Sequence, residues 1–253
     1  MRTNWVRERL RSGKPAIGCF LGLGSPNVAE LMAQAGYDWL LIETEHNGLD
    51  SAEVEHMLVA IKGTDTIPMV RVPSASPVYI QRALDIGAMG LLVPMVKTAD
   101  EARAIVSATR YPPEGTRGFG PLRASSYTMD NEDYFNRAND NIIVALIIET
   151  REAVDNLEAI ARVPGVDAFH LGPADLSIAL GSDPLHLPLP EVDAVLERML
   201  EVGRKTDVAM GTSANDPETL RALQDRGISF LSYGPDYTLM VNAVRAGLDA
   251  FQR

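Results

Sequence analysis

The regular alternation of short β-rich runs with longer amphipathic stretches most constrains the fold of this chain. Runs rich in Val, Ile, Leu and aromatic residues, bounded by Gly, Pro, Asp or Ser, predict eight strands at 16–22, 37–43, 67–72, 88–94, 142–148, 166–172, 208–212 and 229–233. Most of these runs are almost continuously apolar. That pattern is typical of a parallel sheet that is covered on both faces.

The stretches between the strands carry apolar residues at helical spacing. They predict helices over 26–35, 52–61, 77–86, 99–109, 151–161, 190–205 and 217–225. Capping side chains stand at or just before four of these helices, at Ser25, Ser76, Thr98 and Asp216. Strands and helices that alternate in this way over about 250 residues are typical of a (β/α)8 TIM barrel. We therefore predict a single α/β barrel domain spanning residues 1–253.

An open, doubly wound sheet is the alternative fold. It calls for a Gly-rich turn after the first strand, and the turn at residues 22–27 lacks the third Gly of the dinucleotide fingerprint. Two segments exceed a minimal barrel, the polar stretch 110–141 and a terminal helix over 236–251. Insertions of this length commonly serve function or subunit contacts, and a mobile surface loop is the other interpretation of the first.

Composition excludes several classes of protein. The chain has 23 Lys and Arg against 34 Asp and Glu, a net charge of −11, so it lacks the basic surface that nucleic-acid binding requires. It contains no apolar run of about eighteen residues, and its charged N-terminal stretch does not resemble a signal peptide, so we expect a cytoplasmic protein with no membrane contact. The single cysteine, Cys19, excludes an intramolecular disulfide and predicts a buried strand residue.

Polar residues at the C-terminal ends of the predicted strands are the candidates for chemistry, because active sites of such barrels lie at that face. In chain order they are Glu43, Glu45, His46, Arg71, Glu149, Asp175 and Ser213, and the turn Gly172, Pro173 and Ala174 leads from the sixth strand into Asp175. Acidic groups, an imidazole and a guanidinium are therefore expected at one mouth of the barrel.

Glu149 and Asp175 follow neighbouring strands, whose axes lie about 4.8 Å apart, so both carboxylates can reach one cation. Two oxygen ligands with several open positions suit Mg²⁺ or Mn²⁺ completed by waters and a chelating substrate. The alternative is that Glu149 pairs with a neighbouring Arg and that Asp175 only caps the helix that follows it.

Three further groups complete the candidate site. The turn from Gly172 to Asp175 opens a short helix, and its free N–H groups suit a small carboxylate, although a tight turn with no ligand is the other interpretation. His46 is a candidate base, or else an ordinary surface histidine. Arg71 is a candidate partner for an oxyanion, or else forms a salt bridge with Glu43 or Glu45.

Together these groups suit the removal of a proton beside the ketone of a 2-oxo acid, which in the presence of an aldehyde is an aldol reaction. An aldolase that uses a lysine Schiff base needs a desolvated amine. Of the four lysines only Lys97 follows a strand end, and it stands several residues beyond that end, beside a helix start. The residues therefore favour a metal-assisted mechanism over a Schiff base.

Several motifs, in order and across nearly the whole chain, resemble the HpcH/HpaI aldolase family of metal-dependent class II pyruvate aldolases. They lie at 18–24, 35–46, 91–96, 110–118, 148–153 and 172–177. The resemblance implies a divalent cation (Mg²⁺, Mn²⁺ or Co²⁺) on Glu149 and Asp175. It also implies that His46 is the base, that Arg71 stabilises the enolate, and that Ala174 and Asp175 contact the 2-oxo acid.

The resemblance implies two further properties. Asp85 would raise the basicity of His46, although our own assignment puts Asp85 near the end of the helix 77–86, which an ideal barrel places at the opposite face. Family members assemble as homo-hexamers, trimers of dimers that exchange the terminal helix, and act in the catabolism of aromatic compounds. Such an assembly would account for the helix 236–251 and for the segment that holds Arg117 and Arg123.

The chain departs from the family pattern around the substrate. Ile147 stands where the family usually has Gln, Asn47 and Gly48 follow the candidate base, and Phe20 replaces a frequent Trp. We therefore expect cleavage of 4-hydroxy-2-oxo acids such as 4-hydroxy-2-oxoheptane-1,7-dioate, with the aldehyde and the choice of pyruvate or hydroxypyruvate left open. The alternatives are a lyase for CoA esters, of the citrate lyase β or malyl-CoA lyase type, and a non-catalytic barrel that binds a 2-oxo acid.

Overall fold

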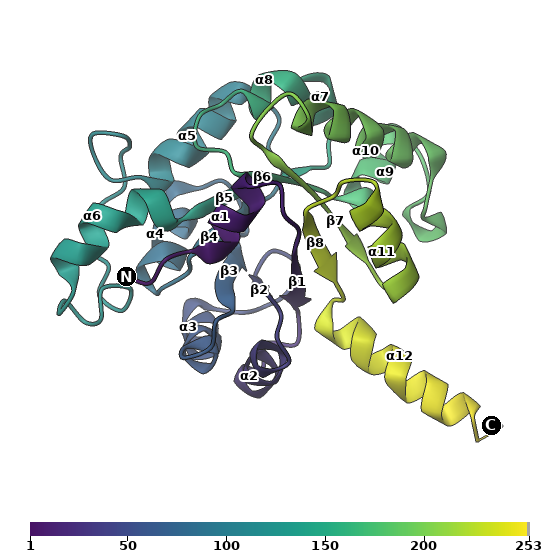
Figure 1. The fold of residues 1–253 in the computed structure, drawn as a ribbon, viewed down its shortest axis with the longest axis horizontal. Helices are drawn as coiled ribbons and strands as arrows, with labels where there is room; N and C mark the ends of the chain where they lie inside the picture. The colour runs from purple at the N-terminus through teal and green to yellow at the C-terminus, as the bar shows by residue number, and fades with distance from the viewer. Residues whose placement is uncertain (252–253) are drawn as a thin grey trace.

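A computed structural model describes residues 1–251 and confirms the predicted (β/α)8 barrel. All eight strands are parallel and pair in sequence order, and β8 closes the barrel against β1 (Figure 1). The strands are β1 (Ala16–Leu21), β2 (Trp39–Glu43), β3 (Ile67–Arg71), β4 (Gly90–Val93), β5 (Ile143–Ile148), β6 (Ala168–Leu171), β7 (Ala209–Ala214) and β8 (Phe230–Tyr233). Each lies within, or differs by up to two residues from, its predicted run.

Helices surround the barrel and connect successive strands. They are α1 (Trp5–Arg11), α2 (Pro26–Gln34), α3 (Ser51–Ile61), α4 (Pro77–Asp85), α5 (Ala99–Thr109), α6 (Asn131–Asn141), α7 (Arg151–Asp155), α8 (Leu157–Ala161), α9 (Pro173–Leu180), α10 (Pro190–Gly203), α11 (Pro217–Asp225) and α12 (Asp236–Asp249), with a 3₁₀ turn at Pro184–His186. The side chains of Ser25, Thr98 and Asp216 cap their helices as predicted. Ser76 precedes α4 without a side-chain cap.

The structure corrects two predicted segments. The helix predicted over 151–161 is two short helices, α7 and α8, which meet at Asn156. The segment 110–141 is not irregular throughout, because its last eleven residues form α6. That helix is very polar, and it buries only Tyr134, Ala138 and Asn141. Its weak apolar pattern explains why the sequence did not reveal it.

The N-terminal end of the barrel is closed by α1. Val6 and Leu10 of this helix pack with side chains of the barrel interior, such as Trp39 and Phe230. Asn4 donates 2.8 and 2.9 Å hydrogen bonds to the carbonyls of Met89 and Asn141, which precede β4 and β5. Only the C-terminal end of the barrel is therefore left for a site, and this is the end where the candidate residues lie.

The last helix, α12, runs away from the barrel instead of folding back over β8 (Figure 1). Its start is anchored by the buried Asp236, which accepts hydrogen bonds from the backbone N–H groups of Gly22 (2.9 Å) and Leu23 (3.2 Å). Beyond that anchor the helix is exposed, including the apolar side chains of Tyr237, Met240, Val241, Val244 and Leu248. Within residues 1–251 no helix combines the length and apolar character needed to span a membrane.

Candidate active site

A pocket of about 220 Å³ lies at the open end of the barrel. Its walls are formed by Phe20, His46, Arg71, Ile147, Glu149, His170, Leu171, Gly172, Pro173, Ala174, Asp175 and Ser213. Every candidate residue predicted from the sequence except Asp85, Glu43 and Glu45 lines this one pocket. The volume suits a small organic acid.

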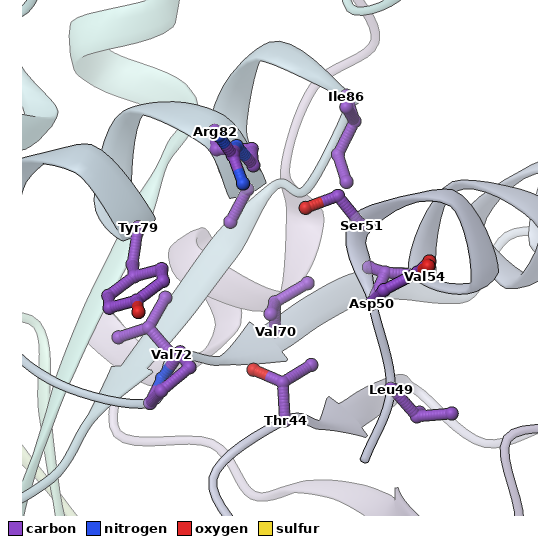
Figure 2. A pocket seen from close by; sticks show the side chains of 12 residues that line it. Thr44, Leu49, Asp50, Ser51, Val54, Val70, Val72, Tyr79, Arg82 and Ile86 are labelled. Carbon is purple, nitrogen blue, oxygen red and sulfur yellow. The ribbon is translucent and has the colours of Figure 1, made fainter.

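A second pocket, of about 190 Å³, lies outside the barrel between α3 and α4 (Figure 2). Val70, Val72 and Thr44 form its floor, and Tyr79 and Arg82 of α4 face them. None of the carboxylates or histidines at the mouth lines it. The chemistry expected from the sequence therefore belongs to the pocket at the mouth.

Arg71 is the positive centre of the mouth. It ends β3 beside Glu43 of β2, and its side chain is buried. Its Nη1 lies 3.0 Å from Glu43 Oε2, while its Nη2 pairs with Glu45 and lies 3.8 Å from Glu149 Oε2. The salt bridges anticipated as the alternative role of Arg71 are thus present. The Nε of Arg71 is buried without a hydrogen-bond partner within residues 1–251, so the guanidinium keeps one donor for a ligand.

Glu149 directly follows β5 and is only 2% exposed. Its Oε1 accepts a 2.6 Å hydrogen bond from the backbone N–H of Met95. Burial raises the pKa of Glu149 above its usual value, and the negative charges of Glu45 and Asp175 act in the same direction. A carboxylate so placed gains from a nearby cation, which offsets both the burial and the repulsion.

Asp175 stands in the first turn of α9, directly after β6. Its carboxylate makes no hydrogen bond to any group in residues 1–251, so it does not cap the helix as the alternative interpretation proposed. Gly172 brings β6 close to Glu149, because a Cβ at that position would lie 2.8 Å from Glu149 Oε2. The absence of a side chain at Gly172 therefore lets the two acidic positions share one space.

The N-terminus of α9 faces the same pocket. Gly172 occupies the capping position and supplies no side-chain oxygen, so the N–H groups of Ala174 and Asp175 have no side-chain cap. Pro173 starts the helix without an N–H of its own. Free N–H groups at a helix N-terminus bind a small carboxylate well.

His46 lies at the rim of the pocket, and its side chain is 60% exposed. Its backbone N–H donates a 3.2 Å hydrogen bond to Glu43 Oε1, which fixes the turn after β2. The imidazole Nε2 lies 3.6 Å from Glu45 Oε2, a carboxylate of the same turn. The ring therefore lies near the Glu45 carboxylate and remains accessible to a substrate.

Asp85 lies outside this pocket. It is the last residue of α4, at the helix end that leads toward the N-terminal end of β4. Its Oδ1 accepts a 2.7 Å hydrogen bond from Nη2 of the buried Arg117. The structure of one chain does not bring Asp85 to His46, so the role of Asp85 in the basicity of His46 stays a prediction.

Ser213 and His170 line the pocket on the side of β6 and β7. The Oγ atoms of Ser213 and Ser232 lie 2.6 Å apart, and Ser213 Oγ lies 3.5 Å from His170 Nε2. Burial, reinforced by the charge of Arg71, lowers the pKa of His170 to about 3, so the imidazole is neutral. The sequence did not show which face of its strand His170 occupies, and it gave no sign of Ser232.

The sequence profile of the HpcH/HpaI aldolase/citrate lyase family matches residues 16–243 of the chain. The chain belongs to this family. The 4-hydroxy-2-oxo-heptane-1,7-dioate aldolase of Shigella sonnei is 42% identical over 246 residues, which cover 96% of this chain and 93% of that protein. The hydroxypyruvate/pyruvate aldolase of Roseovarius nubinhibens is 38% identical over 250 residues, 97% of this chain and 96% of that protein.

A solved HpcH/HpaI family structure from Burkholderia cenocepacia J2315 superposes on this chain with a TM-score of 0.94 at 37% identity, covering 99% of this chain and 100% of that one. The two named aldolases are 42% and 38% identical to this chain over nearly its full length. They identify this HpcH/HpaI protein as an aldolase, a carbon–carbon lyase. The family usually requires a divalent cation. No group of three or more His, Cys, Asp or Glu side chains among residues 1–251 could hold a metal ion by itself.

The two carboxylates at the mouth nevertheless have the ligand type and the charge that such a cation prefers. Glu149 and Asp175 supply hard oxygen ligands, and their mutual repulsion is relieved by a positive charge. Because these two residues would supply only two ligands, the remaining positions would fall to water and to the substrate. An arrangement of this kind suits Mg²⁺ and similar cations, which usually retain several non-protein ligands.

Proposed function

We propose that this aldolase reversibly cleaves 4-hydroxy-2-oxo acids, such as 4-hydroxy-2-oxoheptane-1,7-dioate, to pyruvate or hydroxypyruvate and an aldehyde. One observation carries the proposal: a single small pocket gathers Glu149, Asp175, Arg71, His46 and the uncapped start of α9. The start of α9 suits the carboxylate of a 2-oxo acid, and the two carboxylates with their cation and Arg71 suit its ketone. His46 suits the proton that is transferred. The names of the two aldolase relatives support the same substrate class.

Glu149 and Asp175 would hold the divalent cation, Mg²⁺, Mn²⁺ or Co²⁺. When bound, such an ion supplies Lewis-acid polarisation of the substrate carbonyl. The N–H groups of Ala174 and Asp175 bind the substrate carboxylate and so orient the ketone toward Arg71. Binding at this helix N-terminus would fix the substrate with carbon 4 toward the rim, where His46 lies.

In the cleavage direction His46 takes the proton of the hydroxyl on carbon 4. The bond between carbons 3 and 4 breaks, the aldehyde leaves, and the electron pair of that bond forms the enolate of the 2-oxo acid. The guanidinium of Arg71 stabilises the negative charge that develops on the enolate oxygen. Return of a proton to carbon 3 completes the product, and addition to an aldehyde reverses these steps.

We further propose that the chain acts as a homo-hexamer, a trimer of dimers in which α12 packs against a second copy. Its apolar side chains are exposed, and α12 leaves β8 and β1 without the covering helix that ends a regular barrel (Figure 1). Leu31 of α2 is likewise exposed, at 64%. A second copy of α12 would cover these apolar groups. The proposed pairing of Asp85 with His46 also requires a second copy.

The competing activity on CoA esters is less well supported. Of the residues that line the pocket, Arg71 is the one Lys or Arg side chain, and three carboxylates surround it. The nucleoside diphosphate of CoA needs more positive charge than one arginine paired with three carboxylates provides. Parallel assays of purified protein on 4-hydroxy-2-oxo acids and on malyl-CoA test the assignment. We expect pyruvate from the first and no thioester cleavage, and the reverse result would contradict the proposal.

A further inference from the structure

The side of the pocket formed by β6 and β7 has polar groups that the proposed reaction does not use. Ile147 of β5 and His170 of β6 are paired residues in the parallel register, so their side chains lie together on the inner face of the barrel. Glu149 and Gly172 come two residues later, directly after the same strands, and form the next layer toward the mouth. His170 therefore lies one layer beneath the proposed cation ligand Glu149.

The position of His170 is fixed by aromatic neighbours. Its ring packs edge-on against Phe20, with centroids 5.5 Å apart, and against Phe230, with centroids 6.1 Å apart. These contacts leave the Nε2 edge toward Ser213, at 3.5 Å. The Ser213 hydroxyl is held in turn by Ser232 at 2.6 Å. A separation of 3.5 Å is too long for a strong hydrogen bond, so both groups can accept a further partner.

His170 and Ser213 can together form hydrogen bonds with a neutral hydroxyl group. Because burial holds its pKa far below neutrality, the His170 imidazole is uncharged, and beside its backbone hydrogen bond with Leu171 it offers Nε2 as a hydrogen-bonding partner. The Ser213 hydroxyl also donates and accepts. The anionic parts of a 2-oxo acid already have partners in the start of α9, the cation site and Arg71. The surrounding Phe20 and Ile147 are apolar and would leave a substrate hydroxyl without a partner.

We propose that His170 and Ser213 bind a hydroxyl group on carbon 3 of the 2-oxo acid, so that this enzyme uses hydroxypyruvate in preference to pyruvate as its nucleophile. The proposal rests on the proposed aldolase function. The nucleophile binds against the barrel floor, where His170 is 4% exposed, whereas the aldehyde enters at the rim beside the exposed His46. The pair therefore selects the nucleophile and not the aldehyde.

The test compares kcat/KM for hydroxypyruvate and pyruvate with one aldehyde, together with calorimetric affinities of both acids without aldehyde. We expect wild type to prefer hydroxypyruvate. His170→Phe and Ser213→Ala should each lower the ratio of hydroxypyruvate to pyruvate by about tenfold, the effect of one lost hydrogen bond. His170→Gln, which keeps a donor and an acceptor, should restore part of the preference. His56→Phe, on the exposed surface of α3, is the matched control.

The outcomes separate this inference from the function on which it depends. Turnover of pyruvate by wild type with no preference for hydroxypyruvate would overturn the inference and leave the aldolase assignment intact. An unchanged ratio in both His170→Phe and Ser213→Ala, with folded protein by circular dichroism, would do the same. No turnover of either acid by wild type would overturn the aldolase assignment and the inference together.

Discussion

The backbone N–H of Met95 donates a 2.6 Å hydrogen bond to Glu149 Oε1, and Met95 adopts a left-handed conformation with φ of 59°. A non-glycine residue in that conformation costs roughly 1 to 2 kcal/mol. Such strain clusters at functional sites, where the surrounding structure imposes it. Here it accompanies a contact that leaves Glu149 Oε2 on the side of Arg71, toward the pocket.

This relationship predicts the effect of Glu149→Gln. The amide keeps the shape of the side chain and an oxygen for the Met95 N–H, but it removes the charge that would hold the cation. We expect cation affinity to fall at least about tenfold and metal-dependent cleavage to fall by about 10³-fold. Isothermal titration with Mn²⁺ and a pyruvate-release assay measure the two effects. Glu218→Gln, exposed on α11, is the control, and an equal loss in both variants would contradict the assignment.

His46→Ala separates the base from the cation site. The substitution removes the proton acceptor at the rim but leaves Glu149 and Asp175 in place. We expect the cleavage rate to fall by about 10² to 10⁴-fold, with Mn²⁺ affinity near that of wild type. His56→Ala should change neither quantity, since His56 is exposed on α3. An undiminished rate in His46→Ala would remove this residue from the mechanism.

Arg71→Ala, compared with Arg71→Lys, tests whether the guanidinium has only a structural role. Its removal leaves the carboxylates of Glu43 and Glu45 close together without their counter-charge, so we expect a loss of about 3 kcal/mol in stability. Arg71→Lys retains the charge but loses the forked geometry, so stability should largely recover while the cleavage rate stays about 10²-fold low. Urea unfolding and steady-state kinetics measure the two properties. Full activity in Arg71→Lys would show that the geometry of the guanidinium is not needed.

The neutral, buried His170 makes stability depend on pH. Its pKa is about 3 in the folded chain, against an ordinary value of about 6.5 in the unfolded chain. Between these values the unfolded state binds more protons, so stability falls as the pH is lowered below 6.5. From pH 7 to 5 this loss amounts to about 2 kcal/mol. His170→Phe should lack it, and urea unfolding at pH 5 and 7 compares the two proteins. The same acid sensitivity in both would contradict the neutral imidazole.

The sequence predicted the barrel well because its strands are buried on both faces and read as continuous apolar runs. The same property hid the orientation of His170, since alternation is absent from such strands. Salt bridges of Arg71 with Glu43 and Glu45 could be anticipated from their places at neighbouring strand ends. The roles of Met95 and Ser232 could not, because they depend on backbone conformation and on register between strands distant in the sequence.

The exposed face of α12 predicts an assembly that one substitution weakens. Val244→Asp places a charge among the apolar side chains that a second copy would cover. We expect its mass by light scattering to fall from that of a hexamer to that of smaller species. Asn242→Asp adds the same charge on the same helix, away from those apolar residues, and should leave the mass unchanged. A wild-type protein that is already monomeric would contradict the proposed exchange of α12.

The most direct measurement is pyruvate release from 4-hydroxy-2-oxoheptane-1,7-dioate by purified protein. Assays contain EDTA alone, then added Mg²⁺, Mn²⁺ or Co²⁺, each with and without borohydride, which traps a lysine Schiff base. We expect cleavage to stop with EDTA, to return with a divalent cation and to resist borohydride. Cleavage that persists in EDTA and is abolished by borohydride would contradict it, because the reaction would then depend on a lysine and not on Glu149 and Asp175.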